Sequence, residues 1–345
     1  MVEEAIKNKR ILFVDGAPDT SKVYLDKVFE DGSFGIFTNG STNVFSQLGD
    51  TNFDKRFLLL DANLSQNINL MEADAIFNQI ADGDTHKKTL EKLKNIKGQI
   101  SKNIKFFNQP IFVEKTTREN IYKLLRGIEK VYVPKTIKFK PKSPAEVYNK
   151  IKQDFTLPVI FRQAGDHGGV STIIIDRFED NLFYPFPLDG REYYITQYID
   201  YKKDGVYQKI RLVIVDGVAF IRHVLYNSFW NIHASSRKFM DKNIKYNIEE
   251  LKILKNFEKE LKPNIQRQIT EIHKKIGLDY FGIDCYIDEN FNMLLFEVNA
   301  SMNMLVVNEN HPEDRKKIQK IQVNKIKKAI SNMFTNKLKV NNSNI

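Results

Sequence analysis

The sequence predicts a mixed α/β protein in which a small parallel sheet precedes a larger, mainly antiparallel region. Two apolar runs that each end in an acid, ILFVD (11–15) and RFLLLD (56–61), are typical of buried parallel strands. Residues 86–100 place apolar side chains at helical spacing. Beyond residue 135, short apolar runs alternate with turns, and the Asp-Gly pair at 216–217 is a hairpin signal.

The N-terminal α/β region is expected to end near residue 133. Short strands are expected at 34–38 and 104–110. A helix is expected over 116–128, because the stretch opens with two threonines that can cap its first backbone N–H groups. Strands that alternate with helices indicate a mainly parallel sheet here.

The region that follows contains one predicted helix and several strands. Ser143 followed by Pro144 marks the start of the helix. Strands are expected in LPVIFRQ, TIIIDRF, LFYPFP, REYYITQYID, QKIRLVIVDG and VAFIRHVLY. Consecutive strands of this kind indicate an antiparallel sheet.

The C-terminal third returns to helices. Two are expected after residue 248, separated by Pro263, and Gly277 is expected to close the second. FGIDCYID and MLLFEVN then predict a hairpin, and a Lys-rich helix follows Pro312. The tail, 336–345, is expected to be flexible.

The composition is that of a globular protein. Of the 345 residues 42% are hydrophobic and 12% aromatic, and the length suggests two or three packed units. The single cysteine, Cys285, excludes an internal disulfide and a zinc site with several thiolates. The N-terminus lacks a signal-peptide core, and no apolar run approaches the roughly 18 residues that span a bilayer. We therefore expect a soluble, cytoplasmic protein with no membrane partner.

The net charge is +10, from 53 Lys and Arg against 43 Asp and Glu. A basic balance favours acidic partners, such as nucleic acid or an acidic substrate. The lysines are scattered, with denser stretches at 135–142 and 315–328. Nucleic acid is therefore not the expected partner, and nucleotide phosphates would account for part of the first stretch.

Three oxygen-bearing side chains lie on two neighbouring predicted strands. Glu297 and Asn299 are two residues apart in LLFEVNASMNML (294–305), so they point to the same face of their strand. Asp284 lies in the preceding strand, and a short hairpin would bring all three together. Such ligands suit Mg²⁺ with bound phosphates. The alternative is that they are ordinary polar strand residues that hydrogen-bond to neighbouring loops.

A glycine-rich loop, AGDHGGVST (164–172), lies between two apolar strands. Gly165, Gly168 and Gly169 would let backbone amides approach a phosphate closely, although a mobile turn explains the same pattern. Arg162 ends the strand that enters the loop, where a cation can meet a phosphate or form a salt bridge.

Two arginines lie on the strands of the predicted hairpin around 216–217. Arg211 and Arg222 are placed to clamp a phosphate or an acyl phosphate, with Asn231 and His233 a short way downstream. His233 can also be explained as a structural histidine. No P-loop, GxGxxG, HExxH or GxSxG motif is present.

Taken in their order along the chain, the motifs of this sequence resemble those of the ATP-grasp superfamily. The segments that carry the likeness are VPKT, PVIFRQ, the glycine-rich loop, QYI, IRLVIVDG, IRH, NIH, GID and EVNAS. They are most similar to the branch that holds the glutathione synthetases and the RimK-like ligases, which add glutamate to a ribosomal protein. The likeness covers 131–305, and the N-terminal region only by shape.

The resemblance implies a domain organisation. A pre-ATP-grasp domain would span 1–133, a lid subdomain 134–199, and a C-terminal subdomain with the metal site 200–335.

The resemblance also implies residue roles. Asp284, Glu297 and Asn299 match the positions that hold two Mg²⁺ ions, with Mn²⁺ as an alternative, and Glu297 bridges the two. Arg211, Arg222 and Asn231 match positions that stabilise the γ-phosphate and an acyl phosphate. The implied ATP-binding residues are Arg162, Gly165, Gly168, Gly169, the hinge residues Gln197, Tyr198 and Ile199, and one or more of Lys138, Lys140 and Lys142.

Several positions depart from the family pattern. Arg162 stands where a lysine is usual, and Gln197 and Lys209 stand where an acid is common. ASMN replaces the more usual Ala-Ser-Pro-Gly turn after Asn299. We expect these changes to affect the acceptor pocket and nucleotide affinity more than the fold.

The implied activity is that of an ATP-dependent carboxylate–amine ligase. ATP would phosphorylate a carboxylate, and an amine would attack the acyl phosphate. A peptide or protein modified by an amino acid is the favoured substrate, with a dipeptide-type product as an alternative. Two further classes stay open, a kinase of the same fold and a binding module without catalysis. The sequence is compatible with a monomer or a homodimer.

Overall fold

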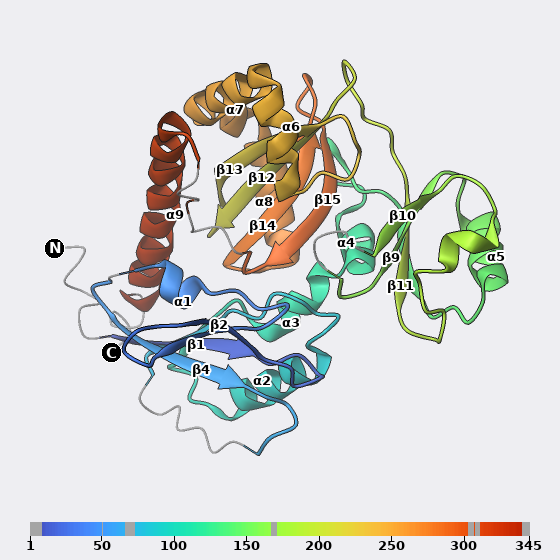
Figure 1. Cartoon of the computed structure of the whole chain (residues 1–345). Helices are drawn as coiled ribbons and strands as arrows, with labels where there is room; N and C mark the ends of the chain where they lie inside the picture. The colour runs from blue at the N-terminus through green and yellow to red at the C-terminus, as the bar shows by residue number, and fades with distance from the viewer. Residues whose placement is uncertain are drawn as a thin grey trace.

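The computed structural model of the chain describes residues 9–49, 51–65, 73–166, 171–302, 307 and 311–339. Three sheets form its framework (Figure 1). We call them the N-terminal sheet (β1, β4, β5, β6), the lid sheet (β8–β11) and the central sheet (β7, β12–β15). The mixed α/β class predicted from the sequence is confirmed, whereas the division into units at 133, 199 and 335 stays a prediction.

The N-terminal sheet is parallel, with strand order β4-β1-β5-β6. Its strands are β1 Arg10–Gly16, β4 Asp54–Leu60, β5 Ala75–Asn78 and β6 Lys105–Phe107. The two acid-terminated runs of the sequence are β1 and β4, and they pair directly. Helix α2, Lys87–Gln99, forms the crossover between β5 and β6, as parallel pairing requires.

Helices cover both faces of the N-terminal sheet. Leu90 and Leu93 of α2 pack into one hydrophobic core with residues of β1 and β5. On the other face, Phe334 of α9 (Glu313–Lys339) makes edge-to-face contacts with Phe13, Phe77 and Phe107. Other apolar side chains of α9 pack against β12, so this helix joins the N-terminal and central sheets (Figure 1).

The strand expected at 34–38 lies outside the parallel sheet. It is β3, Phe34–Phe37, and it pairs antiparallel with β2, Tyr24–Val28, as an exposed two-stranded ribbon. The remaining short helices of this region are α1 Val44–Gln47, α3 Pro110–Val113, the 3-10 turn Glu114–Thr116 and α4 Arg118–Leu125. Thr117 occupies the cap position of α4, but its hydroxyl donates to the carbonyl of Glu114.

The lid sheet is antiparallel, with strand order β10-β9-β11-β8. Its strands are β8 Thr136–Phe139, β9 Val159–Gln163, β10 Thr172–Ile175 and β11 Tyr193–Gln197, and α5, Pro144–Asp154, packs on it. Ser143 caps α5 by accepting the backbone N–H of Glu146, as predicted. LFYPFP forms no strand; it begins in the 3-10 turn Asp180–Phe183, because its prolines lack the N–H that a ladder needs.

The central sheet has the order β13-β12-β14-β15-β7 and is antiparallel except for its last pair. Its strands are β7 Val131–Tyr132, β12 Tyr207–Val215, β13 Val218–Asn227, β14 Tyr280–Ile287 and β15 Met293–Ala300. Both predicted hairpins are present. This sheet provides the floor of the site described below.

Three helices cover the other face of the central sheet: α6 Arg237–Lys242, α7 Ile244–Asn256 and α8 Leu261–Ile276. Pro263 does not separate two helices but lies in the first turn of α8, where a missing N–H costs no hydrogen bond. Gly277 closes α8 with a left-handed φ of 82°, and its N–H donates to the carbonyl of His273. No helix in the described part of the chain is long and apolar enough to cross a membrane.

Candidate active site

A cavity of about 610 Å³ lies between the lid sheet and the central sheet. The lid sheet contributes Ile160, Arg162 and Thr196 to its wall. The loop after β13 contributes the segment 230–235, and the start of α4 contributes Arg118. The cavity is therefore built from segments far apart in the sequence.

One row of side chains crosses its floor. Glu297 of β15 pairs directly with Asp284 of β14, Asp284 pairs with Arg211 of β12, and Arg211 pairs with His223 of β13. All four residues line the cavity. Because neighbouring strands are about 4.8 Å apart, the row spans about 14 Å. The floor thus presents two acids, then a cation, then an imidazole.

Two cations hold Asp284. Its carboxylate accepts two hydrogen bonds from the Arg211 guanidinium, from Nε to Oδ1 at 2.6 Å and from Nη2 to Oδ2 at 2.7 Å. The Lys209 ammonium lies 3.0 Å from Oδ2. Burial alone would raise the pKa of Asp284, but the charges of Arg211 and Lys209 outweigh burial and hold the pKa below its usual value. The carboxylate is therefore ionised.

Glu297 is held by a cation that the sequence did not reveal. Arg118, the first residue of α4, donates Nη2 to Glu297 Oε2 and Nη1 to the carbonyl of Phe296. Asn299 donates Nδ2 to Glu297 Oε1 at 2.9 Å. Burial opposes ionisation of Glu297, yet the charge of Arg118 keeps its pKa below the usual value. Arg118 stands at a helix start with no motif around it, so no local pattern pointed to it.

Arg162 brings a fourth cation to the cavity. Its Nη2 donates to the backbone carbonyl of Asp166 at 2.9 Å, and its buried Nε has no partner among the described residues. Burial, together with the charge of Arg118, lowers the pKa of Arg162 to about 10. We use the name charged floor for the charged residues of the central sheet together with Arg118 and Arg162, which line the same cavity from α4 and from the lid sheet. Its members are Arg118, Arg162, Lys209, Arg211, Asp284 and Glu297. It carries four positive and two negative charges, a surplus of two.

The hinge residues predicted to contact adenine also line the cavity. Gln197 turns its side-chain amide toward the carbonyls of Thr156 and Pro158, and its backbone N–H donates to the carbonyl of Lys135. The Tyr198 hydroxyl bonds that of Tyr207 at 2.7 Å. Tyr198 also meets Trp230 edge to face, at 6.3 Å between ring centroids. This end of the cavity is aromatic and apolar.

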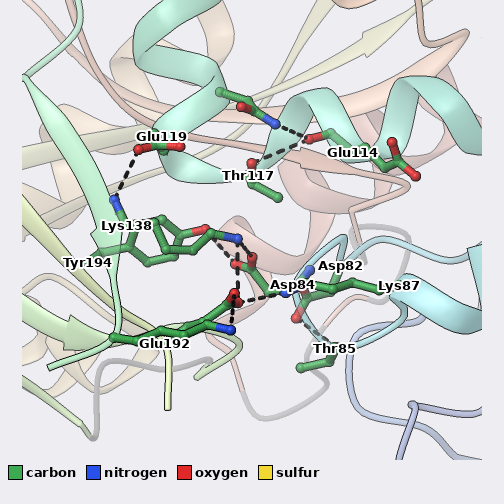
Figure 2. Close-up of polar contacts among 12 residues, drawn as sticks. Asp82, Asp84, Thr85, Lys87, Glu114, Thr117, Glu119, Lys138, Glu192 and Tyr194 are labelled. Atoms are coloured by element: carbon green, nitrogen blue, oxygen red, sulfur yellow. Dashed lines mark hydrogen bonds and ion pairs between the residues drawn. The ribbon is translucent and has the colours of Figure 1, made fainter. Parts of the chain in front are cut away.

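Lys138 and Lys140 do not line the cavity. Figure 2 shows Lys138 reaching Asp84, which follows β5 in the N-terminal region, at 3.0 Å. The Tyr194 hydroxyl donates to the other oxygen of Asp84 at 2.7 Å. Glu192 pairs with Lys87 at 2.7 Å and lies 3.5 Å from Lys138, while Lys140 is mostly exposed. We call this group, Asp84, Lys87, Lys138, Glu192 and Tyr194, the inter-sheet cluster, because it ties the lid sheet to the N-terminal region.

The other predicted residues fall in different places. Asn231 lines the cavity, and Gly165 adopts a φ of 73° where a Cβ would meet the methyl group of Thr85. Gly168 and Gly169 lie outside the described residues. Arg222 is buried and does not line the cavity, because a β-bulge opposite Arg211 makes it an extra residue in β13. His223, its neighbour, lines the cavity in its place.

The sequence predicted that Asp284, Glu297 and Asn299 lie together and hold a metal ion. Within the described part of the chain, no group of three or more His, Cys, Asp or Glu side chains is arranged to hold a metal ion. Asp284 and Glu297 supply two adjacent carboxylates, and Asn299, whose amide is at 2.9 Å from Glu297, supplies an amide oxygen. This donor set suits a hard cation that keeps other ligands, such as phosphate oxygens.

No protein-family model matches the sequence, and the curated proteins give no match either. Solved structures do. The chain is similar to a RimK domain ATP-grasp protein from Sphaerobacter thermophilus, at 10% identity, TM-score 0.50, over 94% of this chain and 98% of that one. It is also similar to the VanG D-Ala:D-Ser ligase from Enterococcus faecalis, at 14% identity, TM-score 0.52, over 94% and 99%. The protein has the ATP-grasp fold, as the sequence motifs predicted.

Proposed function

We propose that the protein is an ATP-dependent carboxylate–amine ligase that forms an amide bond through an acyl phosphate. The supporting observation is the surplus of two positive charges on the charged floor, together with a buried arginine, Arg162, whose Nε has no partner among the described residues. Unbalanced buried charge is unfavourable unless a ligand neutralises it. The phosphates of ATP are the ligand that suits an ATP-grasp fold.

The residues of the charged floor would have separate roles in the reaction. Arg162 and Arg118 would bind the nucleotide phosphates, and the hinge would hold the adenine. Arg211, with Asn231, would stabilise the charge that develops as the terminal phosphoryl group moves to the substrate carboxylate. Arg222 would act through its charge alone, because it does not reach the cavity. Lys138 and Lys140 would meet the nucleotide only if their contacts with Asp84 and Glu192 opened.

Mg²⁺ would be held by Asp284, Glu297 and Asn299, as two ions, with Mn²⁺ as an alternative. When bound, it screens the phosphate charge and polarises the terminal phosphoryl group. Arg211, Lys209 and Arg118 already compensate both carboxylates. We therefore propose that the metal enters together with the nucleotide rather than before it.

The substrate we favour is a peptide or protein carboxylate joined to an amino acid, which fits the net charge of +10. A dipeptide-type product and a homodimeric enzyme stay open. A kinase of this fold would leave the phosphate on its product. A binding module would hold ATP without turnover.

The first experiment measures ADP and phosphate released from Mg·ATP with pools of amino acids and peptides, followed by mass spectrometry of the products. A ligase gives free phosphate and a product lighter by one water than its two precursors together. A kinase gives a product heavier by a phosphoryl group and no free phosphate.

Two variants sharpen this test. Glu297→Gln should abolish turnover. Glu289→Gln is the matched control, because Glu289 lies at the tip of the same hairpin and pairs there with Lys203, far from the row. Turnover that survives Glu297→Gln would contradict the proposed site.

A further inference from the structure

The row on the central sheet ends at His223, on the edge strand. Two strands, β12 and β14, lie between its ends, with Glu297 on β15 and His223 on β13. Arg118 holds Glu297 at the first end. His223 therefore lies at the opposite end of the cavity floor from the carboxylate that Arg118 holds.

The Nε2 atom of His223 has no hydrogen-bond partner in the described part of the chain. It is buried, although the residue lines the cavity. Buried polar groups in native proteins are almost always paired. Protein atoms cover Nε2 itself, so a ligand that enters this end of the cavity would supply the missing partner once the imidazole ring turns Nε2 toward it.

The charges around His223 define what that ligand can be. Burial, and then the positive charges of Arg211, Arg237, Arg222 and Lys209, lower the pKa of His223 well below its usual value. The imidazole is therefore neutral and able to accept a hydrogen bond. The same cations repel an ammonium group but tolerate an uncharged amine, which is the form that can attack a carbonyl carbon.

We propose that His223 is the acceptor-binding residue of the site and that it orients an uncharged amine toward the acyl phosphate. This proposal rests on the ligase function above. The amine N–H donates to an imidazole nitrogen, which leaves the nitrogen lone pair directed toward the acyl carbon near Arg211. The C–N bond forms, the C–O bond to phosphate breaks, and the amine proton leaves with the phosphate as hydrogen phosphate.

The test separates the two half-reactions of the full-length protein with Mg·ATP. The carboxylate probe is a pool of amino acids and of N-acetylated peptides that contain Asp or Glu. In the first stage, concentrated hydroxylamine traps any acyl phosphate as a hydroxamate and needs no acceptor subsite. In the second stage, the amino-acid pool supplies the amine, and the amide product is followed by mass spectrometry.

His223→Leu should leave hydroxamate formation unchanged and raise the KM of the amine acceptor by about tenfold or more. His223→Gln, which keeps a polar group near the position of Nε2, should recover part of the loss. His273→Gln is the matched control, because His273 is half-buried against Phe281, outside the cavity. If His223→Leu does not fold, His223→Gln and His223→Asn carry the comparison.

Equal loss of hydroxamate and amide in a folded His223 variant would overturn the proposal, because it would assign His223 to the donor end. An unchanged acceptor KM would overturn it as well. No hydroxamate from the wild-type protein would instead overturn the ligase function, and the acceptor subsite with it.

Discussion

Arg162 offers a direct test of the charged floor. Its buried charge disfavours the ligand-free folded state, whereas the same charge is proposed to strengthen nucleotide binding. Its guanidinium is buried beside Arg118, which is why its pKa falls to about 10. Its hydrogen bond from Nη2 to the Asp166 carbonyl compensates only part of the free-energy cost of burying this charge. Arg162→Met should therefore leave the free energy of unfolding of the ligand-free protein unchanged or raise it by up to about 1 kcal/mol.

The same substitution should weaken nucleotide binding. A hydrogen bond between a charged donor and a phosphate contributes about 1.5–3 kcal/mol, so the affinity for Mg·AMP-PNP should fall about 10- to 150-fold. Arg162→Lys keeps the charge without the planar fork and should lose less. Isothermal titration calorimetry measures the affinity, and urea unfolding measures the stability.

Arg177→Met is the matched control, because this arginine is exposed and pairs with Glu179 just after β10. It should change neither quantity. A loss of more than about 2 kcal/mol of unfolding free energy in Arg162→Met would refute the reasoning, since it would mark the arginine as structural. An unchanged nucleotide affinity of Arg162→Met would refute the proposed role of Arg162 in phosphate binding.

Three further predictions concern other parts of the molecule. Lys209→Met removes one of the two cations that contact Asp284, so the variant should bind Mg²⁺ without nucleotide strongly enough for calorimetry, whereas the wild type should not. Equal Mg²⁺ affinity of the two proteins would contradict this prediction. Asp84→Asn breaks the inter-sheet cluster at Lys138 and should speed hydrogen exchange in β8 and β11, while Asp189→Asn, on the exposed loop before β11, should not. Burial raises the pKa of Asp15 from 3.8 to about 6, so the folded state favours the protonated acid. The contribution of Asp15 to the free energy of unfolding is therefore largest below pH 4 and falls as the pH rises to 6. Asp15→Asn should therefore raise the melting temperature at pH 7 but not at pH 4, and the opposite order would disprove the assignment.

The fold was largely predictable because its signals are local. Acid-terminated apolar runs gave β1 and β4, the Asp-Gly pair gave the β12–β13 hairpin, and Gly277 gave the end of α8. The order of the motifs then indicated the ATP-grasp fold, which the solved structures confirm. The exposed ribbon was not foreseen as a separate unit, because the short apolar run of β3 looks like any buried strand.

The site was predictable only where its residues share one hairpin. Asp284, Glu297 and Asn299 meet because their strands are consecutive and the side-chain period is two. Arg118 comes from a helix start 179 residues before Glu297, and no periodicity links the two. Lys138 was predicted to meet the nucleotide, yet Asp84, distant in sequence, holds it. Pairings of this kind depend on how separate sheets pack.

The placement of Arg222 and His223 shows how one backbone irregularity decides which residue can do chemistry. In a regular hairpin, the residue opposite Arg211 follows from counting back to the turn. The bulge between Arg211 and Leu212 adds one residue to β13, and this brings His223, rather than Arg222, opposite Arg211. A cation at that place would have extended the positive charge of the floor to its edge. The imidazole instead ends the row with a neutral hydrogen-bond acceptor, and under the proposed ligase function it is this group that would let an uncharged amine approach the four cations.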